Sequence, residues 1–244
     1  MTGLTIDRRF NGPPDSGNGG FTAGRLAAEF PYGTAIQVTL RRPVPLATAL
    51  ALDGTSPTGL RLFDGDELIA EAAAVDPDEL GEPVPDVDAD VAHAAMARFD
   101  GLTAHPFPTC FVCGTRRHLD DGLGLFAGAI TAGDPSRTAT LLRPRTDLTQ
   151  RVVGTGPADI VGPEIVWAAL DCPGGWTLGL PGRPAVLGRM TAEVRAMPAV
   201  GERCVVVGQL DRRDGRKGFT RTAAYGADGR ELGRAAAVWI ETAR

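Results

Sequence analysis

Residues 162–176 form the longest apolar segment with the pattern of a buried helix, and Asp171 is the single carboxylate on its apolar body. Pro163 stands at the first helical position, where proline is tolerated best, and Glu164 suits the positive end of the helix dipole. A buried carboxylate is costly, so it is either paired or functional. The alternative is an Asp half-exposed near a helix end, and this segment alone leaves both interpretations open.

The first half of the chain combines one further helix with several short strands. A loop rich in turn formers, residues 11–20, leads into a helix predicted over residues 21–30, with Asn18 as its N-cap. Asp64-Gly65 marks a hairpin turn. The strand patterns of this half lie at residues 4–10, 35–40, 48–52, 60–63 and 68–75.

Residues 76–109 differ in character from the segments on either side. Their acidic, proline-rich part, residues 76–86, predicts a linker, and residues 88–99 predict a short helix. Hairpin turns return at Asp214-Gly215 and Asp228-Gly229. The strand patterns of the second half lie at residues 122–126, 138–142, 185–196, 203–210, 219–225 and 231–240.

The two halves therefore share one order: a glycine-rich entry, one helix and a meander of four strands. A short sequence echo between residues 64–75 and 228–238 supports a repeat. We expect an α+β protein in which each repeat wraps an antiparallel sheet around a long central helix. Joining the two sheets edge to edge removes two exposed edges. The predicted boundaries are a repeat at 1–76, a linker at 77–109 and a repeat at 110–244.

Composition narrows the class of protein without identifying it. With 244 residues, 43% of them hydrophobic and 23% charged, the chain has an ordinary globular composition. A net charge of -5 argues against nucleic acid as a partner, and no apolar run reaches the roughly 20 residues of a membrane span. The N-terminus lacks an apolar signal core, so we expect a cytoplasmic protein whose four cysteines are free thiols.

Two motifs of the second half resemble those of a known family. They are Cys110-Phe111-Val112-Cys113-Gly114 with Leu123-Gly124-Leu125, and Leu170-Asp171, and the family is that of the hotdog-fold thioesterases. Cys110-Phe111-Val112-Cys113-Gly114, followed nine residues on by Leu123-Gly124-Leu125, resembles the Cys-Phe-x-Cys-Gly opening and the Gly-Leu-x-Leu strand of that family. Leu170-Asp171 matches the Leu-Asp pair near the middle of the family's helix.

The first half is similar to the N-terminal half of double-hotdog acyl-CoA thioesterases. Asn18-Gly19-Gly20-Phe21 matches the glycine pair that opens the helix, and Arg42-Pro43-Val44-Pro45 matches the proline-ended strand beyond it. The resemblance covers about residues 10–75 and 110–241 and implies a double hotdog.

The sequence also departs from the family's pattern. Ala27 stands where the first helix would carry the acid, and Gly162-Pro163-Glu164 replaces the His-Gly-Gly that opens the second helix. In hotdog pairs, amides at one helix start face an acid on the partner helix. The resemblance therefore implies one working site, with residues 18–20 opposite Asp171, and a degenerate site with Glu164 opposite Ala27.

Thioester hydrolysis requires amide donors for the developing oxyanion and a carboxylate that activates water or attacks the thioester. We expect Asp171 to be that carboxylate, with Asn18, Gly19 and Gly20 at the oxyanion. The substrate would be an acyl-CoA or acyl-carrier-protein thioester, and no cofactor is expected beyond the coenzyme A of the substrate. Both a monomer and a homodimer fit a chain that is already a pseudo-dimer.

Four residues are predicted to contact the substrate: Glu164, Trp167, Arg216 and Lys217. The basic run 212–217 suits CoA phosphates, although such runs are more often solvated hairpin tips. Trp167 and Trp176 could line an acyl pocket, and the alternative for both is a core aromatic on the helix face against the sheet.

Other functions and sites were weighed against this one. An acyl-CoA hydratase or dehydratase is less favoured because no Asp-x-Asn-x-x-His stretch occurs, and a non-catalytic acyl-CoA-binding protein is the second alternative. The chain has no Gly-x-Ser-x-Gly elbow, which argues against a serine hydrolase. The sequence places no histidine partner for Cys172 that would make it a nucleophile. His105, Cys110, Cys113 and His118 have the types and number for zinc, but the spacing favours a turn with packed thiols and no metal.

Pro173 leaves the end of the second helix undecided. It either kinks the helix after Asp171 or ends it there, because an interior proline costs about 3 kcal/mol. In the alternative register, Gly174-Gly175 would open the second helix and Asp171 would lie in the loop before it. The first register is preferred because it gives an apolar helix over residues 165–170.

Overall fold

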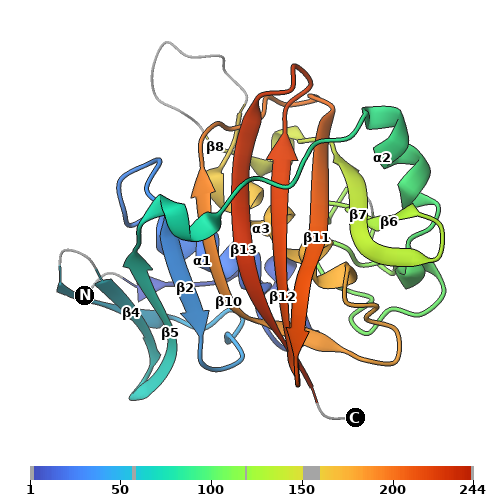
Figure 1. Ribbon diagram of the computed structural model, residues 1–244. Helices are drawn as coiled ribbons and strands as arrows, with labels where there is room; N and C mark the ends of the chain where they lie inside the picture. Colours follow the sequence, from blue (N-terminus) through green and yellow to red (C-terminus); the bar gives the residue numbers. More distant parts are fainter. Residues whose placement is uncertain (1–2, 57–58, 119, 151–159, 243–244) are drawn as a thin grey trace.

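The computed structural model describes residues 3–56, 59–118, 120–150 and 160–242. One antiparallel sheet of eleven strands curves around two helices, α1 (Gly19–Ala27) and α3 (Pro163–Trp176), which lie behind the strands in Figure 1. A third helix, α2 (Ala89–Met96), lies outside the sheet. Within the described residues, no helix is long and apolar enough to cross a membrane.

The strands of the large sheet, and a separate two-stranded ribbon made by β8 and β9, have the following bounds. They are β1 (Gly3–Leu4), β2 (Ile36–Leu40), β3 (Leu50–Ser56), β4 (Gly59–Asp64), β5 (Glu67–Ala74), β6 (Gly128–Thr131), β7 (Asp134–Leu142), β8 (Thr149–Gln150), β9 (Ile160–Val161), β10 (Ala185–Val194), β11 (Cys204–Asp214), β12 (Lys217–Tyr225) and β13 (Glu231–Glu241). Short 3-10 helices lie at Arg8–Phe10, Pro77–Leu80, Asp100–Leu102 and Thr146–Leu148.

The order of the strands is mirrored about the middle of the sheet. It runs β1-β3-β4-β5-β2-β10-β13-β12-β11-β7-β6. The strand after each central helix, β2 or β10, lies at the centre, and Val38 pairs with Met190 there. Moving outward, each side then has the fourth, third and second strand after its helix. The predicted α+β class with one large antiparallel sheet is confirmed.

Helices α1 and α3 approach each other closely because α1 presents two glycines. A Cβ at Gly20 would lie 2.5 Å from the Asp171 Cβ, and one at Gly24 would lie 2.6 Å from the Glu164 Cα. These separations leave no room for a side chain. The glycines thus bring the start of α1 against the middle of α3, where Asp171 lies.

Helix α3 continues through Pro173, so Asp171 lies within the helix and the alternative register is wrong. Threonines of the sheet bind carbonyls of this part of the helix. Thr222 donates its hydroxyl to the Leu170 carbonyl at 2.6 Å, and Thr138 donates to the Pro173 carbonyl at 2.8 Å. These bonds stabilise helix carbonyls next to a residue that lacks an amide proton.

Two predicted strands are wrong or shortened. Residues 122–126 are irregular, because their backbone pairs with the loop around Cys110: the Leu123 and Leu125 amides donate to the Phe111 and Val112 carbonyls. Of residues 4–10, only Leu4 belongs to a strand, and the 3-10 helix Arg8–Phe10 follows.

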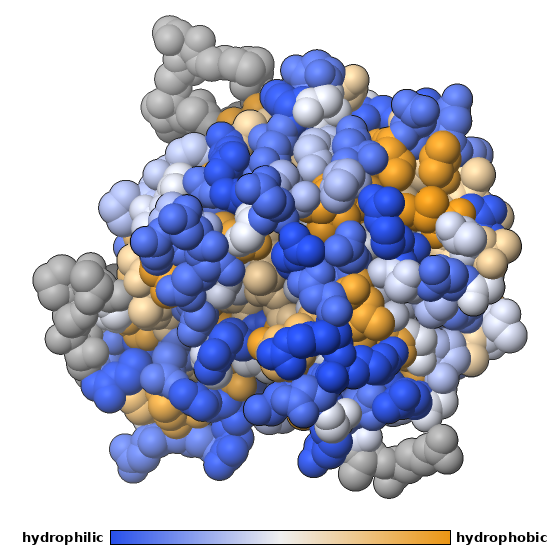
Figure 2. Space-filling view, in the orientation of Figure 1, coloured by the Kyte–Doolittle hydropathy of each residue, from blue (hydrophilic) through white to orange (hydrophobic). Residues whose placement is uncertain are grey.

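The segment predicted as a linker crosses the outer face of β13, β12 and β11, in front of the sheet in Figure 1. The main core lies between the sheet and the central helices. The segment predicted as a linker forms a second buried cluster with the sheet, and Val84, Ala92 and Ala95 are its residues in that cluster. The Tyr225 hydroxyl donates to the Val84 carbonyl at 2.6 Å. Figure 2 shows this outer face, where hydrophilic side chains predominate.

Candidate active site

A cavity of about 500 Å³ lies at the N-terminus of α1. Its walls come from both halves of the chain: residues 12–19 and 40–44 from the first, and residues of α3, β10 and β13 from the second. The segment predicted as a linker adds His105 and Phe107, and the loop at the start of the second half adds Cys110 and Cys113. Apolar side chains line most of the second-half wall, namely Trp176, Leu180, Ala185, Val186, Leu187, Trp239 and Ile240.

Asp171 is the acid of this cavity. Its side chain is buried, and Oδ2 accepts hydrogen bonds from the Gly20 amide at 2.9 Å and from Asn18 Nδ2 at 3.0 Å. Its other oxygen, Oδ1, has no hydrogen-bond partner among the described residues. Burial raises the pKa of Asp171 from 3.8 to about 7; the Cys110 sulfur adds to the rise, and the two hydrogen bonds oppose it.

The start of α1 supplies the amides opposite this acid. Asn18 caps the helix, accepting from the Phe21 amide at 2.8 Å through Oδ1 while its Nδ2 holds Asp171. The Gly20 amide is already bound to Asp171. The Gly19 amide, the first of the helix, has no acceptor among the described residues, and Gly19 lines the cavity. Gly19 is therefore the amide that can receive an oxyanion.

The structure brings Asn18, Gly19, Gly20 and Asp171 together, as the sequence predicted, but divides their tasks. Gly20 and Asn18 position the carboxylate. Of the backbone amides of residues 18–20, only that of Gly19 has no acceptor among the described residues, and Gly19 lines the cavity. The catalytic roles of these residues stay a prediction.

None of the four predicted substrate-binding residues lines the cavity. Trp167 is buried against α1, where its Cβ would meet a Cβ at Gly24, so it is a core residue. Glu164 lies in the first turn of α3, beside α1. Arg216 binds the Glu241 carbonyl at the end of β13, and Lys217 pairs in register with the cavity residue Ile240. Neither basic residue therefore lines the cavity, although Lys217 lies beside a strand of its wall.

Sequence reasoning missed two cations at the cavity. Arg41 and Arg42 line it and are more than half exposed, with ion pairs to Glu71 at 2.5 Å and to Glu67 at 2.8 Å. Their place at the end of strand β2, directly before Pro43, was the available signal. Trp176, which the sequence offered beside Trp167 as a possible pocket residue, does line the cavity, and Trp239 was missed as a wall residue.

Three cysteines form a buried cluster beside Asp171. The Sγ atoms of Cys110, Cys113 and Cys172 all lie within 4.8 Å of one another, and all three residues line the cavity. The Cys110 and Cys172 sulfurs are 3.9 Å apart. Hydrogen bonds from Cys113 and Cys172 lower the pKa of the Cys110 thiol. We call these residues the three-cysteine cluster.

The set His105, Cys110, Cys113 and His118 is not brought together. The His105 Nδ1 accepts from the Phe107 amide at 3.0 Å, so its Nε2 proton donates to the Cys113 carbonyl at 3.0 Å, and both ring nitrogens are occupied. His118 is exposed and contacts Asp120 at 3.3 Å. The predicted set of metal ligands was chosen by closeness in the sequence. It therefore included His118, which lies apart from the cysteines, and omitted Cys172, which lies beside them.

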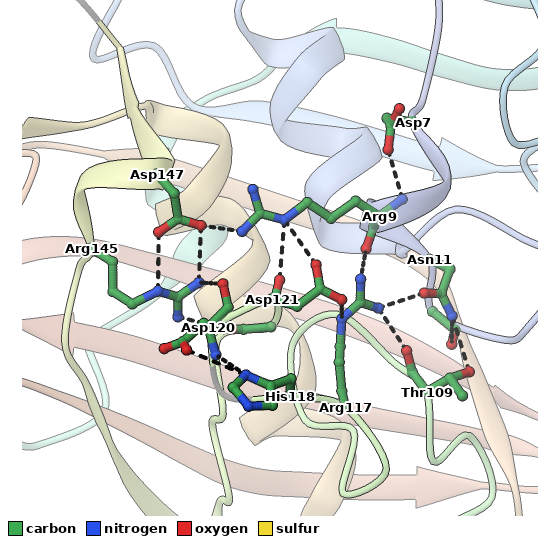
Figure 3. Close-up of polar contacts among 12 residues, drawn as sticks. Asp7, Arg9, Asn11, Thr109, Arg117, His118, Asp120, Asp121, Arg145 and Asp147 are labelled. Carbon is green, nitrogen blue, oxygen red and sulfur yellow. Dashed lines mark hydrogen bonds and ion pairs between the residues drawn. The ribbon is translucent and has the colours of Figure 1, made fainter.

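Figure 3 shows an arginine network that joins the turn around His118 to the N-terminal segment. Arg117 donates to Asn11 Oδ1 at 2.7 Å and to the Thr109 carbonyl at 2.8 Å, and it pairs with Asp121 at 2.9 Å. The network anchors the loop that carries Cys110 against residues 9–11, and leaves His118 at the surface.

No protein-family model and no curated protein sequence matches the chain. Solved structures do. A conserved protein of unknown function with a hotdog fold, from Alicyclobacillus acidocaldarius, aligns with TM-score 0.61 and 15% identity, covering 99% of this chain and 93% of its own. A candidate thioesterase II from Thermobifida fusca aligns with TM-score 0.57 and 14% identity, covering 99% and 92%.

The tesB protein MAP1729c of Mycobacterium avium subspecies paratuberculosis aligns with TM-score 0.55 and 12% identity, covering 93% of this chain and 88% of its own. At such identities the likeness establishes the fold alone. The resemblance that the motifs of the sequence predicted is confirmed at that level: the chain has the hotdog fold.

Proposed function

We propose that the chain hydrolyses an acyl thioester, with acyl-CoA as the substrate, at one composite site between two hotdog repeats. The mirrored strand order and the antiparallel pairing of β2 with β10 support the two-repeat organisation. One observation carries the proposal: a buried carboxylate is fixed through Oδ2 alone, beside the first amide of a helix, in a largely apolar cavity.

The geometry supports a division of labour in the reaction. The Gly19 amide, at the positive end of α1, binds the thioester carbonyl oxygen and stabilises the charge that develops on it. The Oδ1 atom of Asp171 acts as the base toward water, or attacks the carbonyl carbon directly. Asn18 and Gly20 hold the carboxylate in place through Oδ2 and leave Oδ1, which is also buried, without a hydrogen-bond partner among the described residues.

The two ends of the substrate would lie in different surroundings. The acyl group packs against the wall formed by Trp176, Leu180 and Leu187, where its apolar surface is removed from water. The phosphates of coenzyme A lie at the rim, within reach of Arg41 and Arg42, because arginine binds phosphate well. Arg216 and Lys217, which do not line the cavity, remain candidates for the same role.

The names of two structural relatives, a tesB protein and a candidate thioesterase II, favour this reaction class over the alternatives. The other pseudo-site lacks both groups, because Ala27 stands where α1 would carry the acid and Pro163, at the start of α3, has no amide proton. We therefore expect one site per chain.

A thiol-release assay tests the proposal. The protein is offered acyl-CoAs of graded chain length and the same acyl groups on an acyl carrier protein, and free thiol is followed. Release of thiol from acyl-CoA substrates supports the proposal. Release only from the carrier protein would change the substrate class from acyl-CoA to acyl-carrier-protein thioesters. Binding of acyl-CoA without release, or hydration of an enoyl-CoA instead, would refute it in favour of a binding protein or a hydratase.

A further inference from the structure

The three-cysteine cluster has no task in the proposed hydrolysis. Its three residues come from two places, Cys110 and Cys113 from one loop and Cys172 from α3. All three residues are buried, and all three line the cavity, which is large enough for a small ion. The fourth cysteine of the chain, Cys204, is buried on β11 and does not belong to the cluster.

The separations of the sulfur atoms suit a thiolate-bound metal. In a tetrahedral zinc site with Zn–S bonds near 2.3 Å, neighbouring sulfurs are about 3.8 Å apart. The Cys110 and Cys172 sulfurs are 3.9 Å apart, and no pair in the cluster exceeds 4.8 Å. Closure around an ion therefore requires shifts of about 1 Å or less. A disulfide, by contrast, requires about 2.05 Å between two of them.

The groups around the sulfurs provide a second, independent observation. Asn18 Nδ2 lies 4.0 Å from the Cys110 sulfur. Hydrogen bonds from Cys113 and Cys172, together with those from the Val112 and Cys113 amides, lower the pKa of the Cys110 thiol. Donors of this kind suit thiolates, because a thiolate is an acceptor only.

The charge of such thiolates is not balanced by the described side chains. Arg41 and Arg42 line the same cavity, but each is paired with a glutamate. His105 is neutral, with both ring nitrogens occupied by backbone groups. Asp171, one residue from Cys172, adds a further acid to the wall.

The geometry points to a zinc site at Cys110, Cys113 and Cys172, with three thiolate ligands and a fourth position open to the cavity. Thiolate ligands select zinc among the common divalent ions of the cell. Binding converts three thiols to thiolates and releases their protons to solvent, so the ion and ligands together carry one negative charge. The site is a separate property from the proposed hydrolysis, because metal content is measured without substrate.

Metal analysis of the reduced, purified chain tests the site. We expect one zinc per chain in the wild type after growth with zinc. Cys113→Ser and Cys172→Ser should each weaken binding by about 100-fold or more, since even changes outside the ligand set cost 10- to 100-fold. Cys204→Ser is the matched control, a buried cysteine outside the cluster, and should keep the full zinc content. Circular dichroism establishes that each variant is folded.

A second measurement needs no variant. Cobalt added to the metal-free wild type should give thiolate-to-cobalt charge-transfer absorption that saturates at one ion per chain, and zinc should abolish it. The inference is wrong if the wild type, with four titratable thiols, binds neither ion. It is equally wrong if Cys204→Ser loses as much zinc as Cys113→Ser, or if the purified cluster contains a disulfide. None of these results bears on hydrolysis.

Discussion

Replacement of Asp171 by Asn is expected to stabilise the protein at pH 8 relative to the wild type, although it removes the proposed catalytic group. Burial raises the pKa of Asp171 from 3.8 to about 7. Unfolding therefore lets this carboxyl ionise more easily, and the stability of the wild type falls as pH rises between these two values. Asn does not titrate, so the variant escapes this loss.

The magnitude follows from the shift. At about 1.4 kcal/mol for each pKa unit, the rise from 3.8 to about 7 opposes folding by about 4 kcal/mol at pH 8. About 3 kcal/mol of this decrease in the free energy of unfolding of the wild type occurs between pH 5 and pH 8. The side-chain amide that Asp171→Asn introduces has a donor where Oδ1 had no partner, which costs about 1–3 kcal/mol at either pH.

The assay is urea unfolding followed by the fluorescence of the buried tryptophans, at pH 5 and pH 8, with a chelator present to exclude metal. The free energy of unfolding of the variant minus that of the wild type should be about 3 kcal/mol larger at pH 8 than at pH 5. Asp66→Asn, in the exposed β4–β5 turn, is the control and should show no such change. A difference for Asp171→Asn that is equal at both pH values would refute this account of the carboxyl.

Three further predictions concern the same framework. With chelator present, the rate of thioester hydrolysis should rise as pH increases through about 7, because the ionised form of Asp171 is the active one; a rate that is flat from pH 5 to pH 9 would count against this role. Gly20→Ala should lower the free energy of unfolding by about 1–3 kcal/mol, because its Cβ would lie 2.5 Å from the Asp171 Cβ; Gly54→Ala, where a Cβ meets nothing within 4 Å, is the control. Tyr225→Phe should cost about 1 kcal/mol in chemical denaturation by removing the buried bond to the Val84 carbonyl, and an unchanged midpoint would show that water replaces it.

Much of the fold could be predicted from local pattern. The spacing of apolar residues located α1 and α3, and the Asp-Gly pairs located the turns after β4, β11 and β12. The cap at Asn18 was predictable because its side-chain chemistry acts within three residues. The irregular backbone at residues 122–126 was not, since its hydrogen bonds go to the loop of residues 111–112 rather than to a strand.

The pairing of Asp171 with Gly20 could be predicted only through the repeat. The two residues are 151 apart in sequence, and the equivalence of the two halves is what brings them opposite each other. The different tasks of the Gly19 and Gly20 amides depend on which of them faces the carboxylate, and no sequence pattern reports that. Trp167 shows the same limit: an apolar helix has more than one buried side, and this residue faces α1 rather than the cavity.

The cysteines show how tertiary structure overrides sequence spacing. Cys110 and Cys113 suggested nearby histidines as further ligands, yet His118 lies at the surface, and the third cysteine of the cluster, Cys172, comes from α3. A residue 62 positions away becomes a neighbour because α3 packs beside the loop of Cys110. Such a cluster can be found only once the helix is placed.

The most direct test of the composite site is the turnover of Asp171→Asn on the acyl-CoA that the wild type releases fastest, measured at pH 8 beside Asp66→Asn. The account predicts that kcat falls by about 100-fold or more for Asp171→Asn, with the fold intact, and stays at the wild-type value for Asp66→Asn. An Asp171→Asn protein that releases thiol at the wild-type rate would contradict it.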